Sequence, residues 1–297
     1  MSHNSQLVTN AMSVDVEDYF QVSAFESNIS RNDWDKLECR VEQNTLKILE
    51  LFEQKSIKAT FFTLYWVAQR YPDLIRTIID AGHELASHGM EHKRVTQQTP
   101  SEFKADITES KYRLEDISGQ AVIGYRAASY SITSDTYWAL EILAEAGYQY
   151  SSSIYPIRHD LYGIPDAPRF AYKPFSGSQF LEIPISTLQF GNNNYPCGGG
   201  GYFRLFPYQV SRWAINRLND KHQQPALFYF HPWEIDPDQP RQTNVSAKTR
   251  FRHYLNLNRM EQRLSSLLDD FQWNTMKNVF LSDMESHPQI NFSVNRS

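Results

Sequence analysis

Two histidines four residues apart are the first side chains of this sequence whose type and spacing could do chemistry. His88 and His92 follow the apolar-flanked run 82–86. In a helix, both imidazoles would project from one face about one turn apart, close enough to bind a single metal ion. Neutral imidazole is a common metal ligand and suits zinc. The same spacing also occurs on ordinary surface helices, so the metal interpretation needs support from other residues.

A cluster of acidic residues gives part of that support. The apolar, strand-like run that begins at Ala11 ends in Asp15, Glu17 and Asp18. Proteins built of alternating strands and helices place their chemistry at strand ends. Clustered carboxylates repel one another unless a cation lies among them, and Asp15 and Glu17 share a face if the strand continues. Asp18 would project once the chain turns. The alternative is that Asp18 is the N-cap residue of the next helix.

The order of four segments resembles the polysaccharide deacetylase (NodB-homology) family. The acidic strand end and the histidine pair are followed by Arg126, within Gly-Tyr-Arg-Ala, and by His231, within Phe-His. The closer resemblance is to the subfamily that accompanies exosortase-type exopolysaccharide loci. It is carried by the segments 13–20, 198–204, 229–237 and 251–257. The likeness covers about residues 10–285.

The pattern of hydrophobic residues independently predicts alternating strands and helices. We expect strands at 14–16, 59–63, 84–87, 121–124, 148–151 and 226–230, and helices at 40–54, 72–82, 100–119, 134–147 and 207–219. This alternation favours an α/β fold with parallel strands and crossover helices. The resemblance implies a distorted (β/α)7 barrel, which we expect as a single domain over residues 10–285. An irregular insertion rich in Pro and Gly at 155–205 and a helical extension at 240–285 complete the predicted chain.

The resemblance also implies roles for the candidate residues. Amide hydrolysis needs an activated water, a stabilised oxyanion and a proton for the leaving amine. Asp15 takes the role of general base, Arg126 pairs with it, and His231 is the general acid. The implied cofactor is zinc or another divalent transition metal, bound by three protein ligands with one open position. The expected ligands are His88, His92 and Asp18, with Glu17 as the rival of Asp18.

Two positions depart from the family pattern. Ala128 stands where the family usually has proline, which loosens the loop without removing a chemical group. Ser151 stands where relatives commonly carry an aspartate that orients the acid histidine. A serine stabilises imidazolium less well than a carboxylate does. We therefore expect Glu234 or Asp236 to replace the missing acid beside His231.

Aromatic residues near these motifs are candidates for stacking on sugar rings. We expect Tyr130, Tyr202 and Trp233 to bind substrate, with ordinary packing as the alternative. The glycine run 198–201 is not followed by Lys-Ser or Lys-Thr, which excludes a phosphate-binding P-loop. A flexible loop that closes on the substrate is the better interpretation of this run.

Composition narrows the classes of function and location. A net charge of −5 over 297 residues, without a basic patch, argues against nucleic-acid binding. Cys39 and Cys197 lack metal-ligand spacing and fit a reducing compartment. We identify no signal peptide in residues 1–12 and no transmembrane run, so we expect a cytoplasmic protein. A polysaccharide substrate would then be met as a precursor at the inner membrane face, through peripheral contact with exopolysaccharide assembly machinery.

These observations together predict a zinc-dependent deacetylase of N-acetylated amino sugars in an exopolysaccharide or its precursor. Two other functions stay open. One is a carbohydrate-binding protein with weak or no catalysis, which Ser151 would mark as decayed. The other is a hydrolase of a small non-sugar amide. Acetate release from acetylated glucosamine oligomers, compared with small cyclic amides, distinguishes the three.

Overall fold

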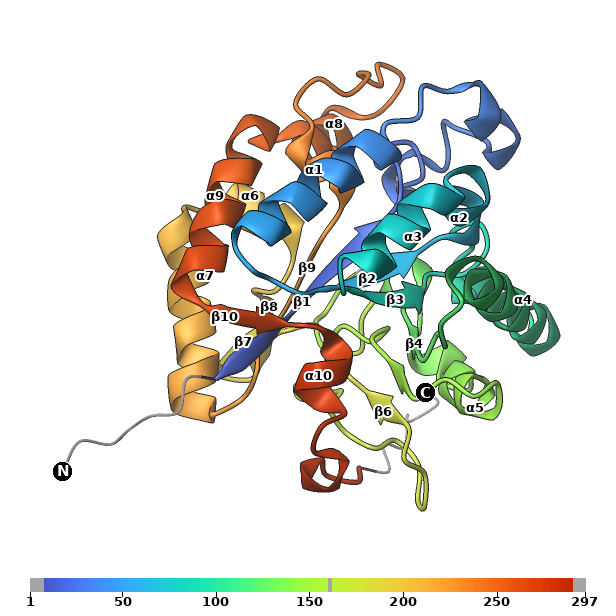
Figure 1. The fold of residues 1–297 in the computed structure, drawn as a ribbon. Helices are drawn as coiled ribbons and strands as arrows, with labels where there is room; N and C mark the ends of the chain where they lie inside the picture. The colour runs from blue at the N-terminus through green and yellow to red at the C-terminus, as the bar shows by residue number, and fades with distance from the viewer. Residues whose placement is uncertain (1–7, 160–161, 291–297) are drawn as a thin grey trace.

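Parallel strands wrapped by helices form the framework of the protein in the computed structural model, which describes residues 8–159 and 162–290 (Figure 1). Strand β1 pairs with β9 on one side and with β2 and β10 on the other, and the sheet continues through β3, β4 and β5 to β6. All these pairings are parallel. The strands are β1 Thr9–Val16, β2 Thr60–Thr63, β3 Glu84–Ser87, β4 Gly124–Tyr125, β5 Tyr150–Ser151, β6 Leu181–Glu182, β9 Leu227–Phe230 and β10 Gln272–Asn274.

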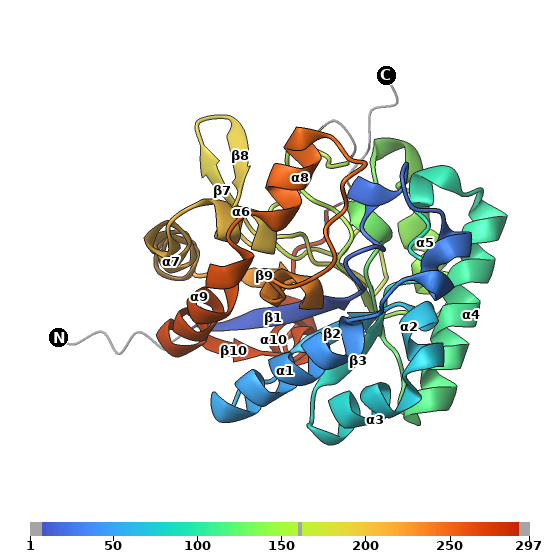
Figure 2. The same ribbon diagram turned by 90° about the horizontal axis from the view of Figure 1, so that it is seen from above.

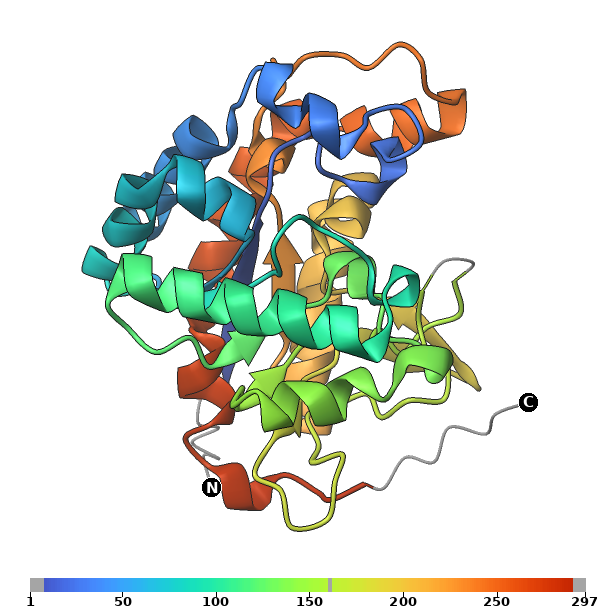
Figure 3. The same ribbon diagram turned by 90° about the vertical axis from the view of Figure 1, so that its right-hand side faces the viewer.

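The sheet curves into an open barrel with helices on its outside. Figure 3 shows α4 running along this outer surface with α5 beside it. The helices are α1 Val41–Gln54, α2 Tyr65–Arg70, α3 Pro72–Asp80, α4 Pro100–Ser118, α5 Ala139–Glu145, α6 Gly200–Leu205, α7 Tyr208–Asn216, α8 Ala247–Tyr254, α9 Leu257–Asp270 and α10 Met276–Phe280. The expected α/β barrel architecture is therefore confirmed.

Local sequence explains where the best-predicted helix begins and ends. The Thr99 side chain accepts from the backbone N–H of Glu102, and the Glu102 carboxylate accepts from that of Thr99, which makes a capping box at the start of α4. Gly119 ends the helix at φ +67°, a left-handed conformation that glycine adopts without strain. The predicted bounds of 100–119 agree with α4 to within one residue.

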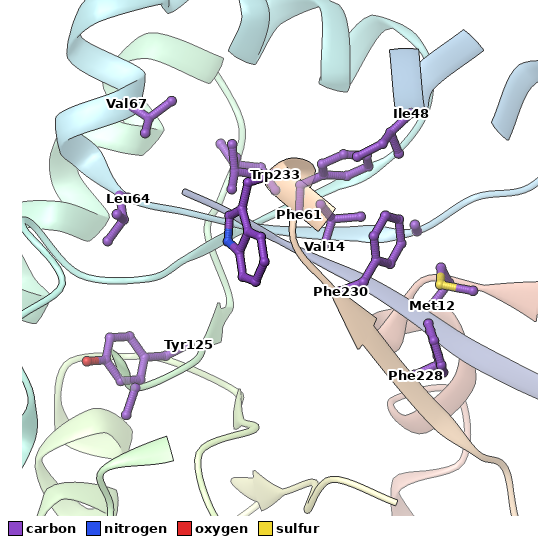
Figure 4. Close-up of a cluster of buried hydrophobic side chains, with 14 of the residues drawn as sticks. Met12, Val14, Ile48, Phe61, Leu64, Val67, Tyr125, Phe228, Phe230 and Trp233 are labelled. Atoms are coloured by element: carbon purple, nitrogen blue, oxygen red, sulfur yellow. The ribbon is translucent and has the colours of Figure 1, made fainter. Parts of the chain in front are cut away.

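The core lies between the barrel strands and their helices. Val14 of β1, Phe61 of β2 and Phe230 of β9 gather beneath Ile48 of α1 in Figure 4. All four are fully buried, and Phe52 of α1 contacts both phenylalanines edge to face. Leu46, which the helical pattern also places on the α1 stripe, is instead 39% exposed. Strands and helix are thus held by one apolar layer, which fixes the strand ends above it.

The segment 155–205 contains more regular structure than the sequence indicates. Strand β6 extends the parallel sheet, the antiparallel strands β7 Thr187–Phe190 and β8 Asn193–Pro196 form a hairpin, and α6 follows. The extension at 240–285 holds α8, α9 and α10, but also β10, which the sequence analysis missed. Over the described residues no helix is long and apolar enough to cross a membrane. Residues 1–7, where most of the signal-peptide prediction falls, lie outside the described residues.

Candidate active site

The carboxyl ends of β1, β3 and β9 meet at one end of the barrel, around a pocket of about 200 Å³. Its lining includes the acids and histidines expected from the sequence, which are Asp15, Glu17, His88, His92 and His231. A larger hollow of about 610 Å³ lies between residues 168–171, 223–225 and 279–290, where no comparable group of acids and histidines meets among the described residues. The chemistry of the side chains therefore identifies the smaller pocket as the candidate site.

Within this pocket, Glu17 joins His88 and His92 in a group that could hold a metal ion. One ligand atom from each residue lies within 4.8 Å of the others, and all three side chains are buried. Oε2 of Glu17 lies 2.9 Å from Nε2 of His92. Burial by itself raises the pKa of Glu17, but positive charge on the neighbouring His92, His231 and His88, when these rings are protonated, lowers it to about 2. Glu17 is therefore the carboxylate that the structure brings to the histidines.

Asp18 does not reach them, so its placement among the metal ligands is wrong. Its Oδ2 accepts from the backbone N–H of Arg40 at 2.6 Å and of Val41 at 2.8 Å, and its Oδ1 accepts from Tyr19 N–H at 2.8 Å. The two bonds on Oδ2 satisfy free N–H groups at the start of α1, whose N-cap residue, Arg40, makes no side-chain cap. Asp18 thus supports a helix that begins 23 residues further along the chain, without being its N-cap residue as the alternative expected.

The two histidines sit on a loop after β3 rather than on a helix, contrary to the expectation from their spacing. Gly89 at φ +82° and His92 at φ +54° turn the chain so that the imidazole centroids lie 5.2 Å apart. The Asp106 carboxylate accepts from Met90 N–H, and Arg31 donates to the carbonyl oxygens of Glu91 and His92. These contacts hold a left-handed residue that a free chain would disfavour. The loop is therefore anchored by segments on either side of it.

The hydrogen bonds of His88 fit a metal ligand. Its Nδ1 lies 2.8 Å from the carbonyl oxygen of Arg126, so Nδ1 carries the proton and donates it. Burial lowers the pKa of His88 to about 4, which keeps the ring neutral and leaves the Nε2 lone pair free. Among the described residues, the buried Oε2 of Glu17 has no hydrogen bond of good geometry. A carboxylate and two imidazoles whose ligand atoms lie this close together fit a divalent cation.

Asp15 stands beside this group and is paired with a buried arginine. Nη1 of Arg126 donates to Oδ1 of Asp15 at 2.5 Å and to Oγ of Ser13 at 2.9 Å. Nη2 donates to Oγ of Ser152 at 3.1 Å. Asp15 and Arg126 are 2% and 0% exposed, so the ion pair is shielded from water. The arginine neutralises Asp15 and leaves its second oxygen toward the pocket.

That second oxygen faces the remaining expected residue, His231. Nε2 of His231 lies 3.9 Å from Oδ2 of Asp15 and 3.4 Å from Oε1 of Glu17. Its Nδ1 lies 2.8 Å from Oε1 of Glu234. Burial alone lowers the pKa of His231, but the Glu234 hydrogen bond and the surrounding carboxylates raise it to about 9. The imidazole is thus held with Nδ1 on a carboxylate and Nε2 toward the pocket.

Glu234, the acid that holds His231, is itself paired with Arg204. Nε of Arg204 donates to Oε2 of Glu234 at 2.7 Å, and both side chains are buried. Asp236, the other expected substitute, instead pairs with Arg40 at 2.5 Å. Ser151 lies on β5, where its Oγ donates to Oγ of Ser153. Glu234 is therefore the carboxylate at His231, and Arg204 is a residue whose role the sequence analysis did not identify.

The glycine run packs tightly instead of forming a flexible loop. A Cβ on Gly198 would lie 2.3 Å from the Leu227 carbonyl oxygen, and one on Gly200 would lie 2.3 Å from Oε1 of Glu234. Gly199 likewise lies against the Tyr229 ring, and within the run only Gly201 faces open space. The run brings α6 against β9 and delivers Arg204 to Glu234. Close backbone approach explains the run, and the lid interpretation is wrong.

Aromatic side chains complete the pocket wall. Tyr130, Tyr162, Tyr229 and Trp233 line it. Within the described residues, the buried hydroxyl of Tyr130 and Nε1 of Trp233 lack hydrogen-bond partners. Tyr130 also has φ +53°, an unusual conformation that often occurs at functional sites. Tyr202, the third expected substrate contact, is 36% exposed on α6 and does not line this pocket. Tyr162 is a pocket residue that no sequence motif identified.

Two protein-family models match consecutive segments of the chain. Residues 33–151 match the model described as polysaccharide deacetylase, and residues 152–281 match a domain of unknown function, DUF3473. Over 108 residues the chain is 27% identical to a peptidoglycan deacetylase of Helicobacter pylori, covering 36% of each protein. Over 100 residues it is 28% identical to a chitooligosaccharide deacetylase of Bradyrhizobium, covering 34% of this chain and 43% of the relative. The chain thus spans less than half the length of these relatives.

Solved structures share the fold over nearly the whole chain. A Mycobacterium smegmatis protein assigned to the polysaccharide deacetylases superposes with a TM-score of 0.63 at 17% identity, covering 98% of this chain and 95% of that one. An allantoinase superposes with a TM-score of 0.59 at 14% identity, covering 97% and 94%. At these identities the likeness concerns the fold.

Proposed function

We propose that this chain, whose residues 33–151 match the polysaccharide deacetylase family, is a metal-dependent hydrolase of N-acetylated amino sugars. One observation carries this proposal. A buried Glu-His-His group lies beside an arginine-paired aspartate and a histidine held by a carboxylate, all facing one pocket. A cation site, a base and an acid are the three groups that amide hydrolysis requires.

Glu17, His88 and His92 would hold the metal in this proposal. Two imidazoles and one carboxylate suit zinc, and also suit other divalent transition metals. When bound, such an ion lowers the pKa of water and polarises the acetyl carbonyl. The three side chains reach it from the end of β1 and from the loop after β3, so its position depends on the Asp106 and Arg31 contacts described above.

Asp15 and His231 move the protons. Oδ2 of Asp15 accepts a proton from the attacking water, while Arg126 binds Oδ1 and orients the carboxylate. The water oxygen first adds to the acetyl carbon, and the carbon–nitrogen bond breaks when the tetrahedral adduct collapses to acetate. Nε2 of His231 gives its proton to the leaving sugar amine. Glu234 stabilises the protonated ring and fixes its orientation through Nδ1.

The substrate class rests on the relatives and on the pocket wall. Curated relatives are named for action on peptidoglycan and on chitooligosaccharide, both of which carry N-acetylated amino sugars. Tyr130 and Trp233 offer buried polar atoms that sugar hydroxyls or the acetamide could satisfy. An exopolysaccharide or its precursor is the proposed target because segments such as 198–204 and 229–237 resemble the exosortase-associated subfamily. The location that goes with this proposal is the inner membrane face, where such a precursor would be met.

Acetate release tests the proposal. The zinc-loaded protein is incubated with N-acetylglucosamine oligomers and, separately, with a small cyclic amide. We expect acetate from the oligomers, lost in Asp15→Asn and retained in Asp220→Asn, a matched change of an exposed aspartate. Turnover of the cyclic amide alone would replace the proposal with a small-amide hydrolase. Oligomer binding without acetate release from the loaded protein would leave a carbohydrate-binding protein.

A further inference from the structure

A cluster of exposed apolar side chains lies on one side of the barrel. Of the ten large hydrophobic side chains exposed in the described residues, eight fall between residues 190 and 251. In Figure 2 their elements, the β7–β8 hairpin with α6, α7 and α8, lie together on the side opposite to α2, α3 and α4. Isolated exposed hydrophobics are ordinary, but a contiguous group marks an interaction surface. We call this group the aromatic face: Phe190, Tyr195, Tyr202, Leu205, Phe206, Val210, Trp213 and Phe251.

Contacts between these side chains join several of them into two groups. The Phe190 ring of the hairpin stacks on Trp213 of α7 with centroids 5.9 Å apart. Phe190 also contacts Tyr195, at 5.8 Å. Val210 and Trp213 are three residues apart on α7, so they lie on one side of that helix. Tyr202 stacks on Phe206 at the junction that leads into α7.

The charge of the same region is opposite to that of the chain. Segments 187–225 and 241–263 carry ten of the 29 lysines and arginines but only two of the 34 acids, a net charge of +8 in a chain of −5. The rest of the chain therefore carries −13. Two of these ten cations, Arg204, which is buried, and Arg212, pair with Glu234 and Asp270 outside the segments. Arg217 lies 5.9 Å from the ring centroids of both Phe190 and Trp213. Arg250 and Arg252 are exposed on either side of Phe251. Arginine side chains thus lie both among and beside the residues of the aromatic face.

This combination favours one kind of partner over two others. A sugar-binding platform places hydrogen-bonding groups beside its rings, whereas Leu205, Phe206 and Val210 offer none. A second copy of the chain in a symmetric dimer would bring the +8 segments against each other. Trp, Phe and Leu flanked by Lys and Arg are the composition of surfaces that lie in the interface of an anionic bilayer. We propose that the aromatic face docks on a membrane surface containing anionic lipids.

Helix α6 joins this docking surface to the active-site pocket. Its Arg204 points inward to Glu234, while Leu205 and the following Phe206 are exposed. Glu234 in turn holds His231, which lines the pocket. A bilayer on the aromatic face would therefore lie one helix away from the side chains that hold the pocket histidine. The docking proposal itself needs no assumption about the reaction, because lipid binding is measured without substrate.

Co-sedimentation with vesicles tests the docking surface. The full chain is mixed with vesicles of phosphatidylcholine alone or with about one third phosphatidylglycerol. We expect binding to the anionic vesicles that weakens with added salt. The double change Phe190→Ala with Trp213→Ala removes the apolar contact, and Arg217→Glu with Arg250→Glu reverses charge. Each pair should weaken binding by on the order of tenfold or more. Tyr112→Ala, a 60% exposed aromatic on α4, should leave it unchanged.

Thermal unfolding of each variant shows whether it folds. Acetate release from oligomers in solution is a second control for an intact fold. No binding of the wild-type chain to anionic vesicles would overturn the proposal, and so would equal binding by the wild-type chain and all variants. A dimer in sedimentation that the Phe190/Trp213 change dissociates would assign the face to a second copy instead. Loss of oligosaccharide binding without loss of lipid binding in that variant would assign it to glycan.

Discussion

Separate substitutions of Glu17 and of Asp18 give the sharpest test of the candidate metal site, because the two acids are neighbours in sequence but have different surroundings. Glu17→Gln keeps the side-chain volume but removes the charge and one ligand oxygen from the group with His88 and His92. Loss of a residue that only orients a ligand costs about 10- to 100-fold in metal affinity. Loss of the ligand itself should therefore cost at least about 100-fold.

Asp18→Asn is the matched control with the opposite expectation. The Asp18 carboxylate accepts three backbone N–H bonds, two on Oδ2 and one on Oδ1. An asparagine has one acceptor oxygen, so its amide group faces an N–H and leaves a buried donor unsatisfied, at about 1 to 3 kcal/mol. We expect metal content to stay near one ion per chain while Tm falls by roughly 2 to 10 °C.

Metal content by elemental analysis and zinc affinity by competition with a chelator separate the two variants, and thermal unfolding records the stability. His88→Ala with His92→Ala is the positive control for metal loss. Glu17→Gln that retains full affinity while Asp18→Asn loses it would refute our assignment of the carboxylate. Retention of stoichiometric metal in the double histidine variant would refute the site altogether.

The contacts around this group and in the neighbouring core support four further predictions. Asp15→Asn should keep the metal and lose nearly all turnover, and a variant within about tenfold of wild type would exclude Asp15 as the base. His231→Ala should lower kcat by on the order of 10²- to 10⁴-fold with metal content unchanged. Gly200→Ala should lower kcat because its Cβ would displace Glu234, whereas Gly201→Ala, which faces open space, should not. Glu182→Gln should stabilise the fold above pH 7: burial raises the Glu182 pKa from 4.5 to about 7, so wild-type stability falls by about 3 kcal/mol as pH rises through that interval. A Tm with the same pH dependence in both proteins would contradict this last prediction.

Strand ends were predictable because the residues that carry chemistry follow short apolar runs. Asp15, His88, Arg126 and His231 all emerge at such ends, and the parallel sheet brings them together around one pocket. Their order along the sequence gave no distances between them. In a barrel of parallel strands, however, residues at the carboxyl ends of the strands lie together at one rim. The helix bounded by the Thr99 capping box and Gly119 was equally predictable, since both of its end signals are local.

The features that could not be predicted depend on contacts between distant segments. Glu17 and Asp18 are adjacent, and only the position of α1 decides that Asp18 caps it and Glu17 turns inward. Helical spacing suggested a helix for His88 and His92, yet two left-handed residues form a loop there, held by Asp106 and Arg31. The glycine run looks flexible in isolation. Its close packing depends on β9 and Glu234, which are distant in sequence.

The charges around His231 support the proposed cation site. Three buried carboxylates surround its ring: Asp15, Glu17 and Glu234. Asp15 has Arg126 and Glu234 has Arg204, each at hydrogen-bonding distance. Glu17 faces only histidines among the described residues. His88 is neutral because burial lowers its pKa to about 4, and His231, whose pKa is raised to about 9, shares its charge among Glu17, Asp15 and Glu234. A buried carboxylate without a permanent partner is costly, so the fold tolerates Glu17 at this position most readily with a divalent cation between it and the two imidazoles.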